Sequence, residues 1–321
     1  MSYLVVSVQV TRPFFAALVV ALGIGVPAAA DNSRPVQAET QQAFWHSVAC
    51  EGAAGASTDA GFPDASNTGV PEGTQLTAYT GPMTIETPGT VIDGKIITGT
   101  LRVTAPDVVI KNSVINYKEM WGINAEYAKN ITIQNSTITG PGASGDSNAP
   151  ILGSGTFIGN NLSQAENGIV LTDGASTVKG NYIHDLASGA VDPHYDGISV
   201  QGRQDGVLIE GNTIDSRGTS NIIIKTDFGD ISNVTVTDNL LIGDAGFNVY
   251  SYGGENGYKT SNINITNNHI EMGNYDYYYI RDSNPNISGN IEYANNQAPQ
   301  PSDLTPGKPS PSACASAVIQ R

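Results

Sequence analysis

One short run of residues concentrates side chains that can transfer protons. It reads Asp-Pro-His-Tyr-Asp and consists of Asp192, Pro193, His194, Tyr195 and Asp196. An imidazole and two carboxyl groups at such close spacing can act as general acids and bases, and the phenol can donate a proton or a hydrogen bond. The alternative interpretation is a surface Asx-Pro turn with an exposed histidine. The run is a candidate site whose geometry depends on the elements around it.

Those elements belong to a repeat. The pattern is apolar, any, small or polar, Asn or Ser, any, apolar, and copies of it follow one another from Val108–Ile115 to a weaker copy at Ile287–Glu292. Repeats at such intervals indicate a solenoid, and the short β-branched runs without a helical period indicate strands. We expect an all-β parallel β-helix of about eight coils. Stacked Asn side chains can hydrogen-bond along its axis and accept the left-handed backbone of a tight corner. The fourth position of the pattern is Ser113, Ser136, Asn160, Asn181, Asn212, Asn239, Asn268 and Asn290.

The candidate run lies in the longest interval between copies. Asn181 and Asn212 are 31 residues apart, whereas the shortest interval, from Asn160 to Asn181, is 21 residues. Insertions in a solenoid form loops on one face, often the binding face. The extra residues fall in Ala187–Asp196, which we expect to be such a loop.

A second expected strand precedes each Asn strand, and its alternation separates the core from the surface. Because coils stack in register, its outward residues should form rows across one sheet. The residues expected in the core are Ile169, Leu171, Ile198, Val200, Ile222, Ile224, Phe247 and Val249. Those expected outside are Thr172, Ser199, Gln201, Lys225, Asn248, Tyr250 and Arg281.

These outward rows gather cations in a chain that has few of them. Lys+Arg is 15 against Asp+Glu 30, yet Arg203, Lys225 and Arg281 all align near the outer end of the second strand. A local cationic row suggests an anionic ligand, and a groove along stacked coils suits a linear polymer whose rings contact tyrosines. The expected substrate-binding residues are Tyr195, Gln201, Asp227, Tyr252 and Arg281.

A polymer that contains uronic acids would explain the mixture of cations and proton carriers. Removal of the C5 proton builds charge on the carboxyl group, which a cation or metal must neutralise while a base takes the proton. Protonation of the leaving oxygen completes β-elimination, and return of the proton to the opposite face gives C5-epimerisation. The candidate catalytic residues are His194, Asp192, Asp196, Lys225, Arg203 and Tyr250.

Two other chemistries remain open. Hydrolysis would use two carboxyl groups about 5–5.5 Å or 6.5–9.5 Å apart, and Asp173, Asp192, Asp196 and Asp227 are the candidates. Oxygen ligands from Asp192, Asp196 and Asp227 could hold Ca²⁺, but no contiguous calcium-loop motif is present. The cofactor is therefore left unknown.

The region from about Thr90 to Tyr293 resembles a known group of proteins. It is similar to the exported right-handed parallel β-helix proteins of the pectate-lyase-like superfamily, which act on polysaccharides. Asp192-Pro193-His194 resembles the Asp-Pro-His motif of mannuronan C5-epimerases and related alginate lyases. The resemblance implies a right-handed β-helix and an acidic polysaccharide as substrate.

The same resemblance implies roles for individual residues. His194 and a tyrosine would transfer protons, while Asp192 and the cations Lys225 and Arg203 would handle the substrate carboxylate. The family pattern has a tyrosine three residues before the aspartate, where this chain has Gly189. Tyr195 or Tyr250 would have to replace it.

These observations predict a polysaccharide lyase that cleaves a uronate-containing polymer by β-elimination. A C5-epimerase or a glycoside hydrolase on the same scaffold is an alternative. Another is a non-catalytic, adhesin-like carbohydrate-binding β-helix in which the titratable groups are incidental. The expected partner is a linear acidic polysaccharide, and the chain is expected to be a monomer. The net charge of −15 argues against a nucleic-acid partner.

The first 30 residues have the form of a secretory signal. Arg12 is their only charged residue, Phe14–Val26 is apolar, and Pro27 and three alanines follow. Because the apolar run is shorter than the roughly 20 residues of a membrane span, we expect cleavage near Ala30. The mature chain should then lack a membrane span and be secreted or periplasmic.

Two segments flank the repeat region, residues 76–293. Residues 31–75 are rich in small and polar residues and are expected to include an N-terminal cap, and residues 294–321 form a Pro-rich tail. The chain's two cysteines, Cys50 and Cys314, lie in these flanks. A disulfide between them and two free thiols fit the sequence equally well.

Overall fold

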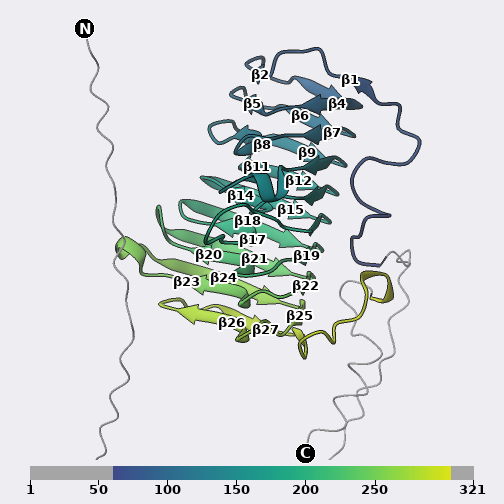
Figure 1. Ribbon diagram of the computed structural model, residues 1–321. Coiled ribbons are helices and arrows are strands. Elements are labelled where there is room, and N and C mark those ends of the chain that lie inside the picture. Colours follow the sequence, from purple (N-terminus) through teal and green to yellow (C-terminus); the bar gives the residue numbers. More distant parts are fainter. Residues whose placement is uncertain (1–60, 305–321) are drawn as a thin grey trace, which may run out of the picture. The chain divides into compact units, whose positions relative to one another are not determined.

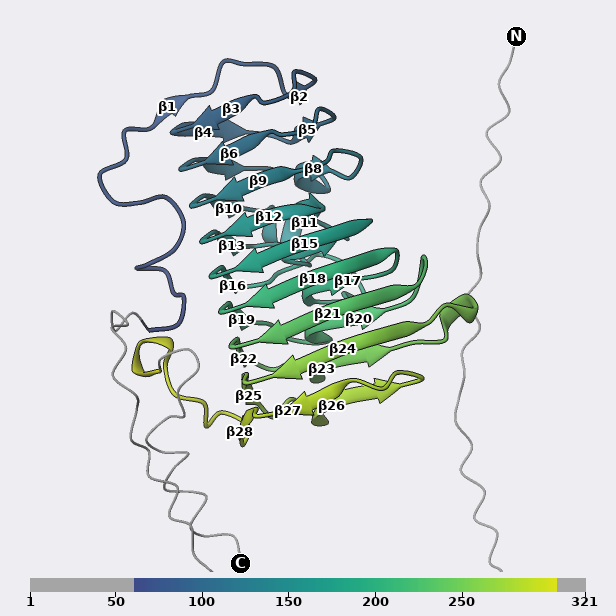
Figure 2. The ribbon, with the colours of Figure 1, turned by 180° about the vertical axis from the view of Figure 1, so that it is seen from behind.

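The computed structural model describes residues 61–304, which form a parallel β-helix (Figures 1 and 2). Each coil contributes one strand to each of three parallel sheets, and successive coils stack along one axis. The chain winds as a right-handed coil, as crossovers between parallel strands nearly always do. The expected signal at residues 1–30, residues 31–60, residues 305–321 and both cysteines lie outside the described residues.

Sheet A has ten strands and contains the strand that follows each Asn position. Its order along the axis is the order of the sequence. The strands are β1 (Thr77–Ala78), β4 (Lys95–Thr98), β7 (Val114–Asn116), β10 (Thr137–Thr139), β13 (Asn161–Ser163), β16 (Tyr182–His184), β19 (Thr213–Asp215), β22 (Leu240–Ile242), β25 (His269–Glu271) and β28 (Ile291–Tyr293).

Sheet B has nine strands and corresponds to the second strand expected from the sequence. Its later strands are longer, which widens the sheet toward the C-terminal coils (Figure 1). The strands are β2 (Thr84–Ile85), β5 (Leu101–Val103), β8 (Trp121–Ala125), β11 (Ala149–Gly153), β14 (Ile169–Leu171), β17 (Asp196–Val200), β20 (Ser220–Lys225), β23 (Phe247–Tyr252) and β26 (Asp276–Arg281).

Sheet C also has nine strands and faces the viewer in Figure 2. The strands are β3 (Val91–Asp93), β6 (Val109–Lys111), β9 (Ile131–Gln134), β12 (Gly155–Ile158), β15 (Gly174–Lys179), β18 (Gln204–Glu210), β21 (Ile231–Thr237), β24 (Thr260–Thr266) and β27 (Asn286–Ser288). From β2 to β28 the chain therefore completes nine coils, one more than the repeat suggested. In the first coil Lys95 takes the Asn or Ser position, so the sequence pattern does not reveal that coil.

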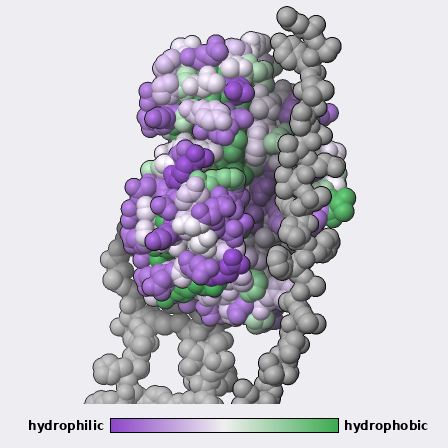
Figure 3. All heavy atoms as spheres, turned by 90° about the vertical axis from the view of Figure 1, so that its left-hand side faces the viewer, coloured by the Kyte–Doolittle hydropathy of each residue, from purple (hydrophilic) through white to green (hydrophobic). Residues whose placement is uncertain are grey.

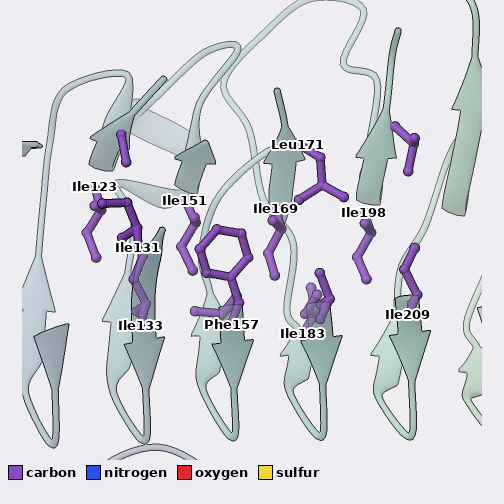
Figure 4. Close-up of a cluster of buried hydrophobic side chains, with 14 of the residues drawn as sticks. Ile123, Ile131, Ile133, Ile151, Phe157, Ile169, Leu171, Ile183, Ile198 and Ile209 are labelled. Atoms are coloured by element: carbon purple, nitrogen blue, oxygen red, sulfur yellow. The ribbon is translucent and has the colours of Figure 1, made fainter. Parts of the chain in front are cut away.

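Apolar side chains from all three sheets fill the interior (Figure 4). Ile151 pairs in register with Ile169, and Ile169 with Ile198, so identical side chains stack coil upon coil. All three are fully buried. Burial of a residue of this size contributes roughly 1.5–3 kcal/mol relative to exposure, so the repeated rows are the main source of stability.

The Asn and Ser positions of the repeat stack at the corner between sheets C and A, as predicted, and we call this stack the ladder. Asn181 Nδ2 donates to Asn212 Oδ1, and Asn212 Nδ2 donates to Asn239 Oδ1, each at 2.9 Å. The left-handed residue, however, is the one before each ladder position: Gly180 and Gly211 have φ of 62° and 63°. The expectation that the ladder Asn itself adopts this backbone is wrong, because no ladder residue has a positive φ.

Two predicted orientations in β23 are also wrong. Phe247 was expected in the core but lies half-exposed against other aromatic rings, whereas Asn248 was expected outside and is fully buried. At the start of the sheet B strands two successive positions face the interior. A Cβ on Gly197 would lie 2.3 Å from Ile214 Cγ2, so only a very small residue fits there. Asn248 occupies the equivalent position of β23, where its side chain accepts a hydrogen bond from Asn221 and donates one to the Glu271 carbonyl.

The ends of the described chain meet beside sheet A. Phe62 is fully buried against Leu240 and Leu304, and its amide donates to the Pro301 carbonyl at 3.0 Å. From there the chain runs along sheet A, where the Gly69 amide donates to the Gly159 carbonyl. The short 3-10 helices are η1 (Gly142–Ser144), η2 (Glu255–Gly257) and η3 (Pro301–Asp303). Among the described residues no helix has the length and apolar character needed to cross a membrane.

Candidate functional site

The outer face of sheet B brings together several of the residues that the sequence singles out. Register pairs Ser199 of β17 with Ile223 of β20, Ile223 with Tyr250 of β23, and Tyr250 with Tyr279 of β26. Asp196, at the start of β17, is the register partner of Ser220. Four successive strands thus carry the site.

Asp196 is a buried carboxyl group with an unusual proton affinity. Its side chain is 6% exposed, and the Ser220 hydroxyl donates to its Oδ1 at 2.5 Å. The pKa of Asp196 is raised to about 7, mainly by burial and in smaller part by the charge of the Glu166 carboxylate. The hydrogen bond from Ser220 and the charge of Lys225 oppose the rise. Asp196 therefore exchanges its proton near neutral pH, where a general acid or base works best.

Two neighbours complete the polar part of this site. The Ser199 hydroxyl is buried and has no hydrogen-bond partner among the described residues. Burial, followed by the charge of Asp196, raises the pKa of Tyr250 to about 12, so its phenol stays protonated at neutral pH. An unpaired hydroxyl and an ionisable acid on β17 and a phenol donor on β23, two strands away, are groups that a polar ligand could satisfy.

The cations of the predicted row are only partly brought together. Lys225 and Arg281 are both register partners of Tyr252, as predicted, and both lie over its ring, at 5.7 and 3.9 Å from the centroid. Arg203 does not join them, because it lies in a left-handed turn after β17 and binds Asp173 at 3.0 Å. Gln201 follows β17 on the same side, half-exposed.

Each cation in this row has an acidic partner, which the sequence did not predict. Lys225 Nζ lies 2.8 Å from Asp227 Oδ1. Arg281 contacts Glu255 at 3.4 Å and Asp282 at 3.5 Å, both looser pairs. The row is therefore not a strip of uncompensated positive charge, and Arg281 is its cation with the longest ion pairs.

The inserted loop before β17 is fixed by a residue that sequence reasoning missed. Buried Glu166 accepts hydrogen bonds from the amides of Ser147 (3.0 Å) and His194 (3.1 Å) and from the Ser188 hydroxyl (2.6 Å). A lone glutamate just before an apolar run was the available signal in the sequence. The effect is to tie the loop to the segment that follows η1.

The side chains of this loop are arranged differently from the prediction. Asp192 and His194 are exposed on the loop, whereas Tyr195 packs against the core under the guanidinium of Arg217. His194 enters sheet B from the start of β17, while Lys225 ends β20. The imidazole and the ammonium thus approach the sheet from opposite ends of its strands.

A group of aromatic rings extends the site toward the C-terminal coils. Ring centroids of Phe247 lie 5.4 Å from those of Tyr250, Tyr275 and Tyr279, and Tyr250 lies 5.2 Å from Tyr279. Tyr252 lies 6.2 Å from Tyr279. We call these five residues the aromatic platform. The dense run of tyrosines between 275 and 279 was the sequence signal for it.

A cavity of ≈ 510 Å³ lies away from this face, at the corner between sheets A and B. Its lining includes Asp215, Asp244, Glu271 and Arg217, with part of the segment after β28 as one wall. Burial raises the pKa of Asp215. Residues 61–304 nevertheless contain no group of three or more His, Cys, Asp or Glu side chains that could hold a metal ion, neither here nor at the aspartates considered for Ca²⁺.

The turns between sheets B and C form a mainly hydrophilic surface with small apolar areas (Figure 3). No protein-family model matches this chain, and no curated protein or solved structure matches it significantly. The fold and the geometry of sheet B are therefore the basis for any functional conclusion.

Proposed function

We propose that this protein binds an acidic polysaccharide along the outer face of sheet B and cleaves it by β-elimination. The observation that carries the proposal is that Asp196, Lys225 and Tyr250 lie on three successive strands of sheet B, close enough for the charge of Lys225 to lower the pKa of Asp196 and for Asp196 to raise that of Tyr250. A proton acceptor that titrates near neutrality, a cation and a protonated phenol are the three functions that β-elimination needs. The resemblance of the repeat region to the pectate-lyase-like superfamily is a second reason for this proposal.

Each group has one role in the proposed reaction. The ammonium of Lys225 neutralises the uronate carboxylate, and the Asp196 carboxylate takes the C5 proton. Electrons of the C5–H bond form the C4–C5 double bond as the bond from C4 to the glycosidic oxygen breaks. The Tyr250 phenol protonates that oxygen. The exposed His194 is a second proton carrier at the start of β17.

A glycoside hydrolase is the second candidate, because Asp196 also has the property of a general acid. Its pKa is raised by burial and by the neighbouring Glu166 carboxylate, as expected for one member of a catalytic carboxyl pair. The pH dependence separates the two reactions. A lyase that uses Asp196 as a base gains activity as the pH rises through about 7, whereas a hydrolase that uses it as an acid loses activity.

The test is a panel of polymers that includes pectate, alginate, glucuronan and neutral glucans. A lyase produces unsaturated uronate ends that absorb in the ultraviolet. An epimerase changes the C5 configuration without new chain ends, and a hydrolase gives reducing ends without absorbance. Binding without any turnover would leave the adhesin-like alternative.

A matched pair of lysine variants tests the site. Lys225→Ala should abolish turnover, whereas Lys179→Ala, which removes a surface lysine paired with Glu210 on sheet C, should leave it unchanged. Equal activity of the two variants on the cleaved polymer would contradict the placement of the site on sheet B.

A further inference from the structure

The aromatic platform is not required by the proposed bond-breaking chemistry except through Tyr250. Its other members are held in mutual contact on β23, β26 and the turn before β26. Tyr275 is 77% exposed, although its ring contacts Phe247. Large aromatic surfaces left open beside one another commonly mark a binding surface.

We propose that the platform stacks the sugar rings of an acidic oligosaccharide, and this inference rests on the proposed function. Aromatic faces bind the apolar faces of pyranose rings, while phenol hydroxyls supply hydrogen bonds at the edges. Three of the rings lie along β23, and Tyr279 lies beside Tyr250 on the next strand, so the platform is an array over two neighbouring strands of sheet B. A linear ligand can therefore contact successive members.

Two cations lie beside the platform, each paired with carboxylates of the chain, and Arg281 has pairs that a ligand carboxylate can replace. Tyr252 lies between the cations Lys225 and Arg281. Arg281 is half-exposed, and its contacts with Glu255 and Asp282 are 3.4 and 3.5 Å long. A ligand carboxylate can form a shorter, bidentate pair with this guanidinium and displace these contacts. A neutral glucan offers no such exchange.

The platform also sets the direction in which the ligand extends. Asp196 lies on β17, and β26 is three strand spacings further along sheet B. At about 4.8 Å per spacing, the distance is about 14 Å, close to the length of three pyranose rings in an extended chain. The bound polymer should therefore extend from Asp196 toward the C-terminal coils, with about three sugars between Asp196 and the far edge of the platform.

Binding of defined oligosaccharides tests this inference. Hexamers of galacturonate, mannuronate and glucuronate, with cellohexaose as the neutral comparison, are titrated by calorimetry into the full chain carrying Asp196→Asn, so that turnover does not intervene. At least one hexauronate should bind more tightly than cellohexaose. For that sugar acid, affinity should rise from the dimer to about the tetramer and then level off.

Platform variants then locate the ligand. Tyr275→Ala and Tyr279→Ala should each raise Kd about three- to tenfold. Arg281→Gln should raise it for the uronate but not for cellohexaose. The control is Tyr127→Ala, since Tyr127 is 74% exposed in the turn after β8 and away from the platform. The control should leave Kd unchanged.

The outcomes separate this inference from the proposed reaction. Weaker binding in the platform variants without turnover of any polymer by the wild-type chain would refute the reaction and support the platform. Turnover with KM unchanged in Tyr275→Ala and Tyr279→Ala would refute the platform and support the reaction. Failure of every hexauronate to bind, or an equal effect of Tyr127→Ala, would also overturn the platform.

Discussion

Two stacks of polar residues run along the same solenoid, and they are built differently. In the ladder between sheets C and A, Asn181, Asn212 and Asn239 repeat one residue type and pass identical hydrogen bonds from coil to coil. On the outer face of sheet B the register-paired residues are of several types, and Ser199, Ile223, Tyr250 and Tyr279 follow one another. There Asp196 keeps a buried ionisable group and Ser199 a buried unpaired hydroxyl.

The difference separates a stack that stabilises the fold from one that is available for a ligand. Each ladder amide satisfies its neighbours, so the stack gains hydrogen bonds without leaving an orphan. Sheet B buries polar groups at a free-energy cost that the fold itself does not recover. Such costs concentrate at functional sites, and the predictions below measure them.

The largest contrast concerns activity. Asp196→Asn should lower kcat by about 10²–10⁴-fold on the polymer that the wild type cleaves, because it removes the proposed proton acceptor. Asn290→Ala, at the end of the ladder, should leave kcat unchanged. Initial rates at saturating substrate measure both. A wild-type kcat in Asp196→Asn would exclude the residue from the reaction.

The same carboxyl group should make stability depend on pH. Its pKa is raised from 3.8 to about 7 in the folded chain, so the folded state binds the proton more tightly than the unfolded state. The protein therefore loses stability as pH rises from about 4 to about 7, by up to about 4 kcal/mol from this group. Asp196→Asn should remove that loss.

Urea unfolding of the wild type and Asp196→Asn at pH 4 to 8 gives the measurement. The free energy of unfolding of the variant should rise relative to that of the wild type as the pH increases across this range. A difference that stays constant with pH would mean that Asp196 is ionised in the folded chain at all these values.

In the ladder, by contrast, truncation of an Asn side chain should lower the free energy of unfolding. Asn212 donates to Val178 and Asn239 and accepts from both the amide and the side chain of Asn181. Asn212→Ala should therefore destabilise the fold by about 3 kcal/mol, because several buried partners lose their bonds. Asn290→Ala, half-buried in the last coil, should cost about 1 kcal/mol. Equal losses of stability in the two variants would show that the number of buried hydrogen bonds in the ladder does not determine the cost.

The smallest effects compare two buried serines. Ser136 in the ladder accepts from the Ser113 amide and donates to the Gln134 carbonyl, so Ser136→Ala should cost about 1–2 kcal/mol. Ser199 has no such partner, and Ser199→Ala should raise stability by about 1 kcal/mol. Chemical denaturation resolves the sign. Destabilisation of both variants alike would remove the distinction between the two stacks.

Much of the architecture was predictable because it repeats. The interval between copies predicted a β-helix, and the alternation in the second strand correctly placed Ile198 and Ile222 in the core. The alignment of Lys225 with Tyr252 and Arg281 followed from the same register. The inward turn of Asn248 did not follow, since the double inward position at the strand start depends on space left by sheet A.

The site was predictable only in part, because its properties come from neighbours in other coils. The candidate run located Asp196, but it made Asp192, which is exposed, an equally strong candidate. Glu166 and Asp227, which set the charges around Asp196 and Lys225, come from other strands and turns. Local spacing contains no information about these encounters.

The amino-acid sequence by itself determined the stacking of coils, because identical side chains at one interval favour their own register. Only the tertiary structure decided which polar groups are buried, which cations are paired and which aromatic rings meet. Burial and electrostatic pairing depend on the distance between residues of different coils, and only folding fixes that distance.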